Sequence, residues 1–556
     1  MKPYLGRYVG TLSRLLALEL TPKWVRVLLL LIVAVSVVVG FWLSFYLPVL
    51  GDGCLHAYLA DEIEETGAPA ETLQPVVTEY EEGYPVYYPQ FFHVSLSMSS
   101  MVTGTLKVLA PLLRIATILL VFLIGRDVLK SATIGLILAF VIACYPQFLL
   151  YTSTIFVESL VVFLFFATLY AHYKGVTENS KVYLLLSGLF LGAAVATKHQ
   201  MLLLPIVIVV QHIWLRGGAR RLLYLAVPLL FVCIPVYGHV YNSTGTVMFP
   251  TMNEAIDSIW PGKYHYSEES YDITEALLEQ RGIYHVTYFN PGTLIEFFSP
   301  TTYHNYNFFN QSMAAFFTIF AVLGAIYAIH ASRGKRRLLL WLLIPIIVYF
   351  PLLEFTKLTR YFLPITLLGA FSMAAAALFL KQMLGKPRLR SLAMLLLVGL
   401  FTGFGVAYAV GAMDVRDKAD TMLWSPSKGK MTYVIEAYEF IDNNIDADDV
   451  VVDPNNYATL YYSSAKVCWI NEYGNAEFFL PIWDGDLEGI YAQFQKNDIR
   501  YVVIRKNTLV YKDDIDSTTQ FPMETYMLIK ESPVFELAFE RPDLEVYSFD
   551  AARVQE

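Results

Sequence analysis

An aspartate stands where a charge is unusual, directly after the first long apolar segment of the chain. Asp52 lies between two glycines in the run Gly-Asp-Gly-Cys-Leu-His, which follows residues 24–50. No Lys or Arg occurs between positions 27 and 106. A carboxylate at the mouth of a membrane span can take a proton from a hydroxyl, which is the work of a general base. The plain alternative is an aspartate that caps a helix in a glycine turn.

A second carboxylate, Glu158, lies at the end of the otherwise apolar residues 155–173. An ionisable group inside a membrane span is expensive to bury and is therefore a functional candidate by default. The alternative is that the Glu158 side chain snorkels, so that its carboxylate lies at the membrane–water interface. Asp52 and Glu158 are thus the predicted catalytic pair. They are also the residues that would hold a divalent cation, Mg or Mn, the one cofactor left open.

Three cations interrupt apolar sequence in short connections. Lys198 lies between two apolar half-segments, and Lys357 and Arg360 flank the start of residues 361–380. Arg offers a planar fork to a phosphate and Lys offers a point charge. We therefore predict that these three side chains bind a donor phosphate. Ion pairs with Glu354 or with lipid headgroups are the alternative.

Side chains that can hydrogen-bond or stack on a sugar ring accompany these charges. His56 falls one helical turn after Asp52. The residues assigned to acceptor or sugar binding are His56, Asp61, Glu62, Tyr88, His93, His199 and Tyr361. The aromatic residues among them are also consistent with a plain interfacial belt. The later acidic residues Glu79, Glu81 and Glu82 are interpreted as solvated surface.

The composition of the chain is that of an integral membrane protein. The chain has 556 residues, of which 56% are hydrophobic and 16% charged, and its mean hydropathy is +0.47. Soluble globular proteins carry about 25% charged residues. The net charge of −9 argues against a nucleic-acid partner. Four cysteines without a CxxC pair make a zinc site improbable, and whether Cys54 and Cys468 form a disulfide stays open.

Apolar runs predict about eleven transmembrane helices. They lie near residues 24–50, 105–125, 132–149, 155–173, 182–196, 200–215, 222–240, 311–330, 338–353, 361–380 and 391–413. Each is close to the length that crosses a hydrocarbon core roughly 30 Å thick. Residues 90–104 are either an interfacial helix or the start of the second span. Lys107 and Arg114, in the outer half of that span, either lie outside it or face the site.

Basic and non-basic connections alternate along these spans. Because basic loops stay on the cytoplasmic side, the N-terminus is predicted inside and the C-terminus outside. The predicted domains are a cytoplasmic segment 1–23, a transmembrane domain 24–413 with outer loops 51–104 and 241–310, and a soluble extracytoplasmic α/β domain 414–556. All candidate site residues then share the outer face of a multi-pass plasma-membrane protein.

The layout resembles the polyprenyl- or dolichyl-phosphate-sugar-dependent glycosyltransferases of the C-type membrane fold, such as the protein O-mannosyltransferases and aminoarabinose transferases. The resemblance rests on Asp52 at the head of an acidic outer helix, on Tyr88 and His93, on residues 192–204 around Lys198, and on the Arg-Tyr-Phe-Leu-Pro run at 360–364. It covers roughly residues 24–380. Where those enzymes carry an Asp-Glu pair, this chain has Asp52-Gly53. The Trp-Trp-Asp-Tyr-Gly signature of oligosaccharyltransferases is absent, which favours a single-sugar enzyme.

The resemblance implies a mechanism. A sugar on a lipid monophosphate would be attacked directly at its anomeric carbon, with inversion. Asp52 would act as the general base, Glu158 would orient the acceptor or assist the base, and the three cations would hold the phosphate. The implied partners are the lipid-phosphate donor, membrane lipid and an acceptor glycan, lipid or protein.

Two other classes of protein fit the sequence less well. A transporter or flippase of lipid-linked sugars places charges and broken helices at the bilayer midplane, often in repeated halves, whereas the charges here gather at one interface. A membrane-anchored ligand-binding receptor leaves Glu158 and the outer cations without a role.

Overall fold

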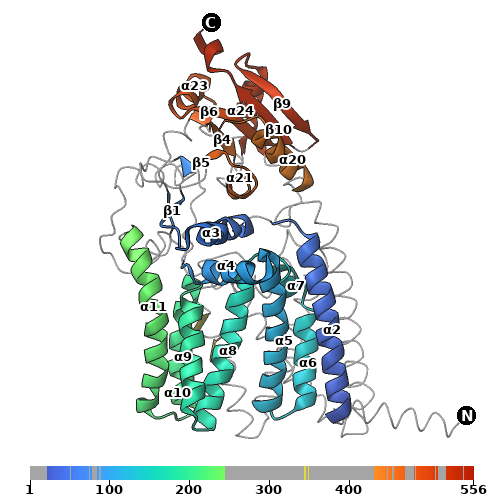
Figure 1. The fold of residues 1–556 in the computed structure, drawn as a ribbon, viewed down its shortest axis with the longest axis vertical. Coiled ribbons are helices and arrows are strands. Elements are labelled where there is room, and N and C mark those ends of the chain that lie inside the picture. Colours follow the sequence, from blue (N-terminus) through green and yellow to red (C-terminus); the bar gives the residue numbers. More distant parts are fainter. Residues whose placement is uncertain are drawn as a thin grey trace, which may run out of the picture.

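The computed structural model describes a helix bundle, a layer of short elements across one end of it, and a mixed sheet beyond that layer (Figure 1). The described residues are 22–49, 52–73, 76–77, 84–86, 89–244, 344–345, 348–349, 431–446, 449–453, 456–469, 481–482, 484–506, 509–510, 521–542 and 544–555. Tyr88, Lys357, Arg360 and Tyr361, and nearly all of the last four predicted spans, lie outside these ranges.

The bundle contains a helix at each of the first seven predicted spans. Its helices are α2 Pro22–Tyr46, α5 Leu109–Asp127, α6 Ala132–Ala143, α8 Glu158–Thr177, α9 Lys181–Val195, α10 Leu204–Trp214 and α11 Leu222–Thr244. Short 3-10 turns lead into three of them: η1 Leu106–Val108, η2 His199–Leu203 and η3 Ala219–Arg221. Among the described residues, four helical stretches are long and apolar enough to cross a membrane, at 22–46, 106–127, 158–177 and 219–242.

Two boundaries differ from the sequence-based prediction. The span predicted at 132–149 ends at Ala143, and α7, Pro146–Tyr151, follows as a separate helix. The reason is Pro146, which cannot donate a backbone hydrogen bond and favours the first position of a new helix. Residues 90–104 form a helix of their own, α4 Phe91–Thr103, which ends at Gly104 with a left-handed φ of 72°. The segment is therefore a separate helix and not the start of the second span, while its position at the membrane interface stays a prediction.

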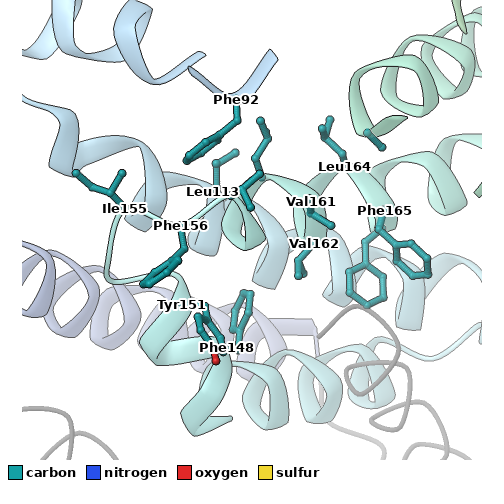
Figure 2. Close-up of a cluster of buried hydrophobic side chains, with 14 of the residues drawn as sticks. Phe92, Leu113, Phe148, Tyr151, Ile155, Phe156, Val161, Val162, Leu164 and Phe165 are labelled. Atoms are coloured by element: carbon teal, nitrogen blue, oxygen red, sulfur yellow. The ribbon is translucent and has the colours of Figure 1, made fainter. Parts of the chain in front are cut away.

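Burial separates the centre of the bundle from its edge. Helix α8 is buried over most of its length, whereas α2 and α11 expose large apolar side chains such as Leu30, Val38 and Phe231. Apolar side chains on an outer surface fit a lipid environment. The central cluster brings Phe92 of α4 together with Leu113 of α5, Phe156 and Val161 (Figure 2). It therefore holds α4 against the end of the bundle.

Two helices and a small strand pair lie between the bundle and the sheet. Helix α3, Asp52–Thr66, packs beside α4, and both lie across the ends of the bundle helices (Figure 1). Strands β1 Thr72–Leu73 and β3 Tyr84–Pro85 pair antiparallel. All of these elements fall inside the predicted outer loop 51–104.

The sheet has six strands in the order β2-β5-β4-β6-β10-β9. These are β2 Val76–Val77, β5 Lys466–Trp469, β4 Val450–Asp453, β6 Ile499–Arg505, β10 Leu544–Phe549 and β9 Phe535–Arg541. The pairs β2-β5, β4-β5 and β4-β6 are parallel, and β10 is antiparallel to both neighbours. Around them lie α20 Met431–Asp442, α21 Asn456–Tyr462, α23 Leu487–Lys496, α24 Met523–Glu531, η8 Ala551–Gln555 and the pair β7 Leu509–Val510 and β8 Phe521–Pro522.

The helices α20 and α23 and the strands β4 and β6 belong to residues 414–556, the segment for which α/β structure was expected. Strand β2 was not predicted, and it comes from the stretch between α3 and α4. We call the described residues from 431 onward the tail.

Candidate active site

Asp52 is the first residue of α3 and is half-buried. The helix α2 ends at Tyr46, and α3 begins at Asp52. Unpaired backbone N–H groups gather at the start of a helix, so a carboxylate at this position is electrostatically favoured. The placement fits both a capping aspartate and a side chain presented at the edge of the bundle.

The glycine after Asp52 has a packing reason. A Cβ atom at Gly53 would lie 2.7 Å from the backbone oxygen of Ile155. Real Cβ atoms do not approach an oxygen so closely, so α3 can rest on this carbonyl only through a glycine. Ile155 lies three residues before Glu158. The contact therefore brings the start of α3 beside the segment that leads into α8, and it explains why this chain lacks a second carboxylate directly after Asp52.

Glu158 and Lys198 form a buried ion pair. The Lys198 Nζ lies 2.7 Å from the Glu158 Oε1, with 15% of the lysine side chain and 3% of the glutamate side chain exposed. Glu158 is the first residue of α8, and Lys198 sits in extended conformation between α9 and η2. Because the nearly fully buried Glu158 carboxylate would be left uncompensated without Lys198, the pair fixes the turn after α9 against α8. Lys198 was predicted to bind a phosphate, and here it neutralises Glu158.

Helix α4 is tied to the same turn. The Phe91 amide donates to the Ala196 carbonyl at 3.3 Å, two residues before Lys198. Four segments thus form a closed ring of contacts. They are the start of α3, α4, the turn at 196–198, and the segment from Ile155 to Glu158. The predicted residues Asp52, His56, His93, Glu158 and Lys198 all lie on this ring.

A hydrogen-bonded chain of buried side chains joins α4 to α3. His93 Nδ1 lies 2.8 Å from Gln90 Oε1, and His93 Nε2 lies 2.9 Å from His56 Nδ1. All three side chains are at most 3% exposed. An amide oxygen can only accept, so in this orientation His93 carries its proton on Nδ1 and His56 donates from Nδ1. Burial and the neighbouring His56 hold the pKa of His93 well below its usual range, which favours the neutral ring.

The other predicted sugar-binding residues lie further from Asp52. Asp61 follows it by nine positions in α3, which places it on the opposite face of the helix. Glu62 is half-buried on the same helix and interacts with Tyr58. His199 faces α11, with its ring centroid 6.0 Å from that of Tyr237. The roles of these residues stay predictions.

Lys107 and Arg114, for which the sequence left two alternatives open, both form hydrogen bonds between helices. Lys107 Nζ donates to the Leu47 carbonyl at 2.9 Å, and Ser44 Oγ donates to the Lys107 carbonyl at 2.6 Å. These bonds join the end of α2 to η1. Arg114 is fully buried in α5 and donates to the Ala143 carbonyl at 2.9 Å. Both residues therefore have structural partners away from Glu158.

A cation held by Asp52 and Glu158 stays a prediction, whereas Cys54 and Cys468 do not form a disulfide. No group of three or more His, Cys, Asp or Glu side chains close enough to hold a metal ion occurs within the described ranges. Cys54 and Cys468 are free, buried thiols. Burial raises the pKa of both well above the usual thiol range, so both are protonated and unreactive.

Comparison with known proteins identifies the fold. Residues 88–239 match the family described as Dolichyl-phosphate-mannose-protein mannosyltransferase. A comparison with curated proteins gave no match. Among solved structures, the archaeal oligosaccharyltransferase AglB from Archaeoglobus fulgidus, in complex with an inhibitory peptide and a dolichol-phosphate, matches with a TM-score of 0.57 at 14% identity. That match covers 86% of this chain and 69% of AglB.

A second structure is similar over nearly its whole length. ArnT from Cupriavidus metallidurans in the apo state matches with a TM-score of 0.57 at 14% identity, covering 94% of this chain and 98% of ArnT. Its complex with undecaprenyl phosphate matches with a TM-score of 0.53 at the same identity, 14%, over 95% of this chain and 98% of ArnT. The chain therefore has the C-type glycosyltransferase fold. It resembles the membrane glycosyltransferases that depend on polyprenyl-phosphate sugars, as its layout predicted.

Proposed function

We propose that this protein is an inverting glycosyltransferase, which moves a single sugar from a polyprenyl- or dolichyl-monophosphate donor to an acceptor hydroxyl. The observation that carries the proposal is the ring of contacts around Asp52. The close approach of Gly53 to the Ile155 oxygen holds α3 beside the segment that leads to Glu158, and Glu158 is already paired with a cation. A base, a second carboxylate and a positive charge thus belong to one assembly at one end of the bundle.

Asp52 is the proposed general base. Its carboxylate takes the proton of the acceptor hydroxyl while that oxygen attacks the anomeric carbon and the bond from this carbon to the phosphate oxygen breaks. The lipid phosphate leaves with the bonding electrons, and direct attack inverts the configuration. Asp52 suits this role because it is half-buried, so its carboxylate keeps access to a substrate. Glu158 is proposed to orient the acceptor or to assist the base.

The donor class rests on the family match and on the structural neighbours. AglB and ArnT were solved with dolichol-phosphate and undecaprenyl phosphate respectively. In this chain, Lys198 is a described cation and is paired with Glu158. Its flexible stem lets the ammonium contact both Glu158 and an arriving phosphate. Lys357 and Arg360 complete the proposed phosphate site and belong to residues outside the described ranges.

The proposed location is the extracytoplasmic face of the plasma membrane. A lipid-linked donor keeps its chain in the bilayer, so the transferring site has to lie at an interface. The end of the bundle that carries α3 and α4 is opposite the connections with Arg126, Lys130, Lys181 and Arg216. Basic connections favour the cytoplasmic side, which supports the proposal that the end with Asp52 lies outside.

The proposal is tested by replacing the base. Asp52→Asn keeps the size of the side chain and removes its basicity, so sugar transfer from a polyprenyl-phosphate sugar in detergent should fall by roughly 10²–10⁴-fold. Glu64→Gln is the control, because Glu64 is exposed on the same helix. Transfer by Asp52→Asn at the wild-type rate, with equal folded protein, would rule out the assigned role.

A further inference from the structure

Residues 47–49, which follow the end of α2 at Tyr46, are held from both sides. On the bundle side, Lys107 Nζ donates to the Leu47 carbonyl. On the other side, the hydroxyl of Tyr462 in the tail contacts both polar groups of Val49. The Val49 amide donates to Tyr462 Oη at 3.0 Å, and Tyr462 Oη donates to the Val49 carbonyl at 3.0 Å.

The Tyr462 hydroxyl stays protonated, so it acts as both donor and acceptor toward Val49. Burial raises the pKa of Tyr462 above its usual range, so the hydroxyl stays protonated and can donate and accept at once. Val49 is 4% exposed, and a buried backbone group that loses its partner is costly. Cys54 Sγ adds a weaker bond to the Val49 carbonyl at 3.4 Å. The last described residue before Asp52 is therefore anchored to the tail.

The helix that carries Tyr462 is itself packed on α3. A separate apolar cluster combines Leu55 and Leu59 of α3 with Leu460 of α21 and Val467 of β5, together with Leu73 and Val86. Strand β2 pairs in parallel with β5, so the stretch between α3 and α4 supplies an edge strand of the sheet. Figure 1 shows α21 directly over α3. The tail and the outer layer thus share one apolar core and one sheet.

Within the tail, α21 is fixed by a buried polar network. Asp453 Oδ2 accepts from Thr459 Oγ1 at 3.0 Å and from the Tyr438 hydroxyl, and the Arg505 guanidinium lies 3.2 Å away. Asp453 ends β4, Arg505 ends β6 and Thr459 belongs to α21. Because the network ties α21 to two strands, the position of Tyr462 is set by the sheet.

We infer that Tyr462 of the tail is a positioning residue for the Asp52 base. It acts through the backbone of Val49, which fixes where α3 begins and so where the carboxylate points. Displacing a catalytic group by about 1 Å can cost roughly 10²-fold in rate. The inference rests on the proposed function and extends it, because it makes the tail part of the catalytic apparatus. If the tail only packed on α3, the apolar contacts between them would be enough. The two hydrogen bonds to Val49 are directional and constrain the start of α3 more closely than those contacts do.

The test removes one oxygen. Tyr462→Phe keeps the ring and its packing and removes the hydroxyl that contacts Val49. We expect kcat to fall by about 10-fold, with KM for the lipid donor changed less than twofold because donor-binding groups are untouched. Tyr461→Phe is the matched control, the same change one position earlier on α21. The inference is overturned if Tyr462→Phe keeps its kcat, or if its loss of activity only follows a loss of folded protein.

A second measurement does not depend on transfer activity. Hydrogen exchange of a peptide covering residues 47–55 should be faster in Tyr462→Phe than in the wild type and in Tyr461→Phe, because the Val49 amide loses its acceptor. Unchanged exchange would show that the hydroxyl does not hold this segment. If the wild type transfers no sugar but the exchange rate rises as expected, the proposed function fails while the anchoring of α3 by the tail stands.

Discussion

Among the described residues, Glu158 pairs with Lys198 at the end of the bundle and Asp453 pairs with Arg505 in the tail, and both pairs are buried. In the tail, both members end β-strands, and 2% of the arginine and 0% of the aspartate side chain is exposed. At the end of the bundle, the lysine comes from a turn and 15% of it is exposed. A guanidinium held among rigid strands stays with its carboxylate. An ammonium on a flexible stem can exchange one anion for another, which is the role that we propose for Lys198 with the donor phosphate.

The largest expected effect comes from breaking the tail pair. Asp453→Ala leaves Arg505 buried without its carboxylate and removes an acceptor from Tyr438 and Thr459. Breaking a buried pair in this way costs about 3–5 kcal/mol. Thermal unfolding of the purified protein in detergent should show this loss, whereas Glu439→Ala, an exposed change on α20, should not. An unfolding temperature within the error of the wild type would mean that the network does not hold the tail.

Breaking the pair at the bundle end should affect rate more than stability. Glu158→Gln keeps the shape and a hydrogen-bond acceptor for Lys198, and the lysine is exposed enough to recover solvation. We expect kcat for sugar transfer to fall by roughly 10²-fold, the cost of removing one electrostatic group from a reacting site. Steady-state kinetics and thermal unfolding should be measured on the same preparation. Normal turnover per folded molecule, with a stability loss equal to that of Asp453→Ala, would make both pairs structural.

The smallest expected effect is on the pH dependence of stability, and it comes from Asp61, whose neighbours are also carboxylates. Burial, together with Glu64 and Glu65, raises the pKa of Asp61 from its ordinary 3.8 to about 6. The folded state then holds this proton more tightly than the unfolded state, so stability should fall as the pH rises from about 4 to about 6. Asp61→Asn should flatten this part of the stability profile, while Glu531→Gln, exposed on α24, should keep it. An identical slope in Asp61→Asn would assign the pH dependence to other groups.

The sequence predicted most of the bundle because each helix there must be apolar along its whole length. It also pointed to Asp52 and Glu158, since a carboxylate next to lipid is rare enough to stand out. The partner of Lys198 was not predicted, because 40 positions separate it from Glu158 and no local pattern joins them. Gln90 and His93 are three residues apart and lie on one helix face, a spacing that favours a hydrogen bond between their side chains. The sequence-based prediction did not include this pair.

The contacts made by the tail had no signal in the sequence. Tyr462 is one of 38 tyrosines, and the residues next to it in the sequence do not distinguish it from the others. Strand β2 has two residues, too few for an alternating pattern to appear. Gly53 looked like a missing carboxylate, and only the position of the Ile155 oxygen shows that no side chain fits there. Steric facts of this kind depend on a neighbour that the local sequence does not contain.

The strand pairing between β2 and β5 also orders events during biosynthesis. Val49 and its partner Tyr462 are separated by 413 positions. At about 5–20 residues per second, a ribosome needs roughly 20–80 s to travel that distance. Throughout this interval α3 has been synthesised, but its anchor Tyr462 and the strand β5 that pairs with β2 have not. The nascent chain can therefore insert its helices while the base that we propose is still unpositioned, and competence for transfer would arrive only with the last part of the polypeptide.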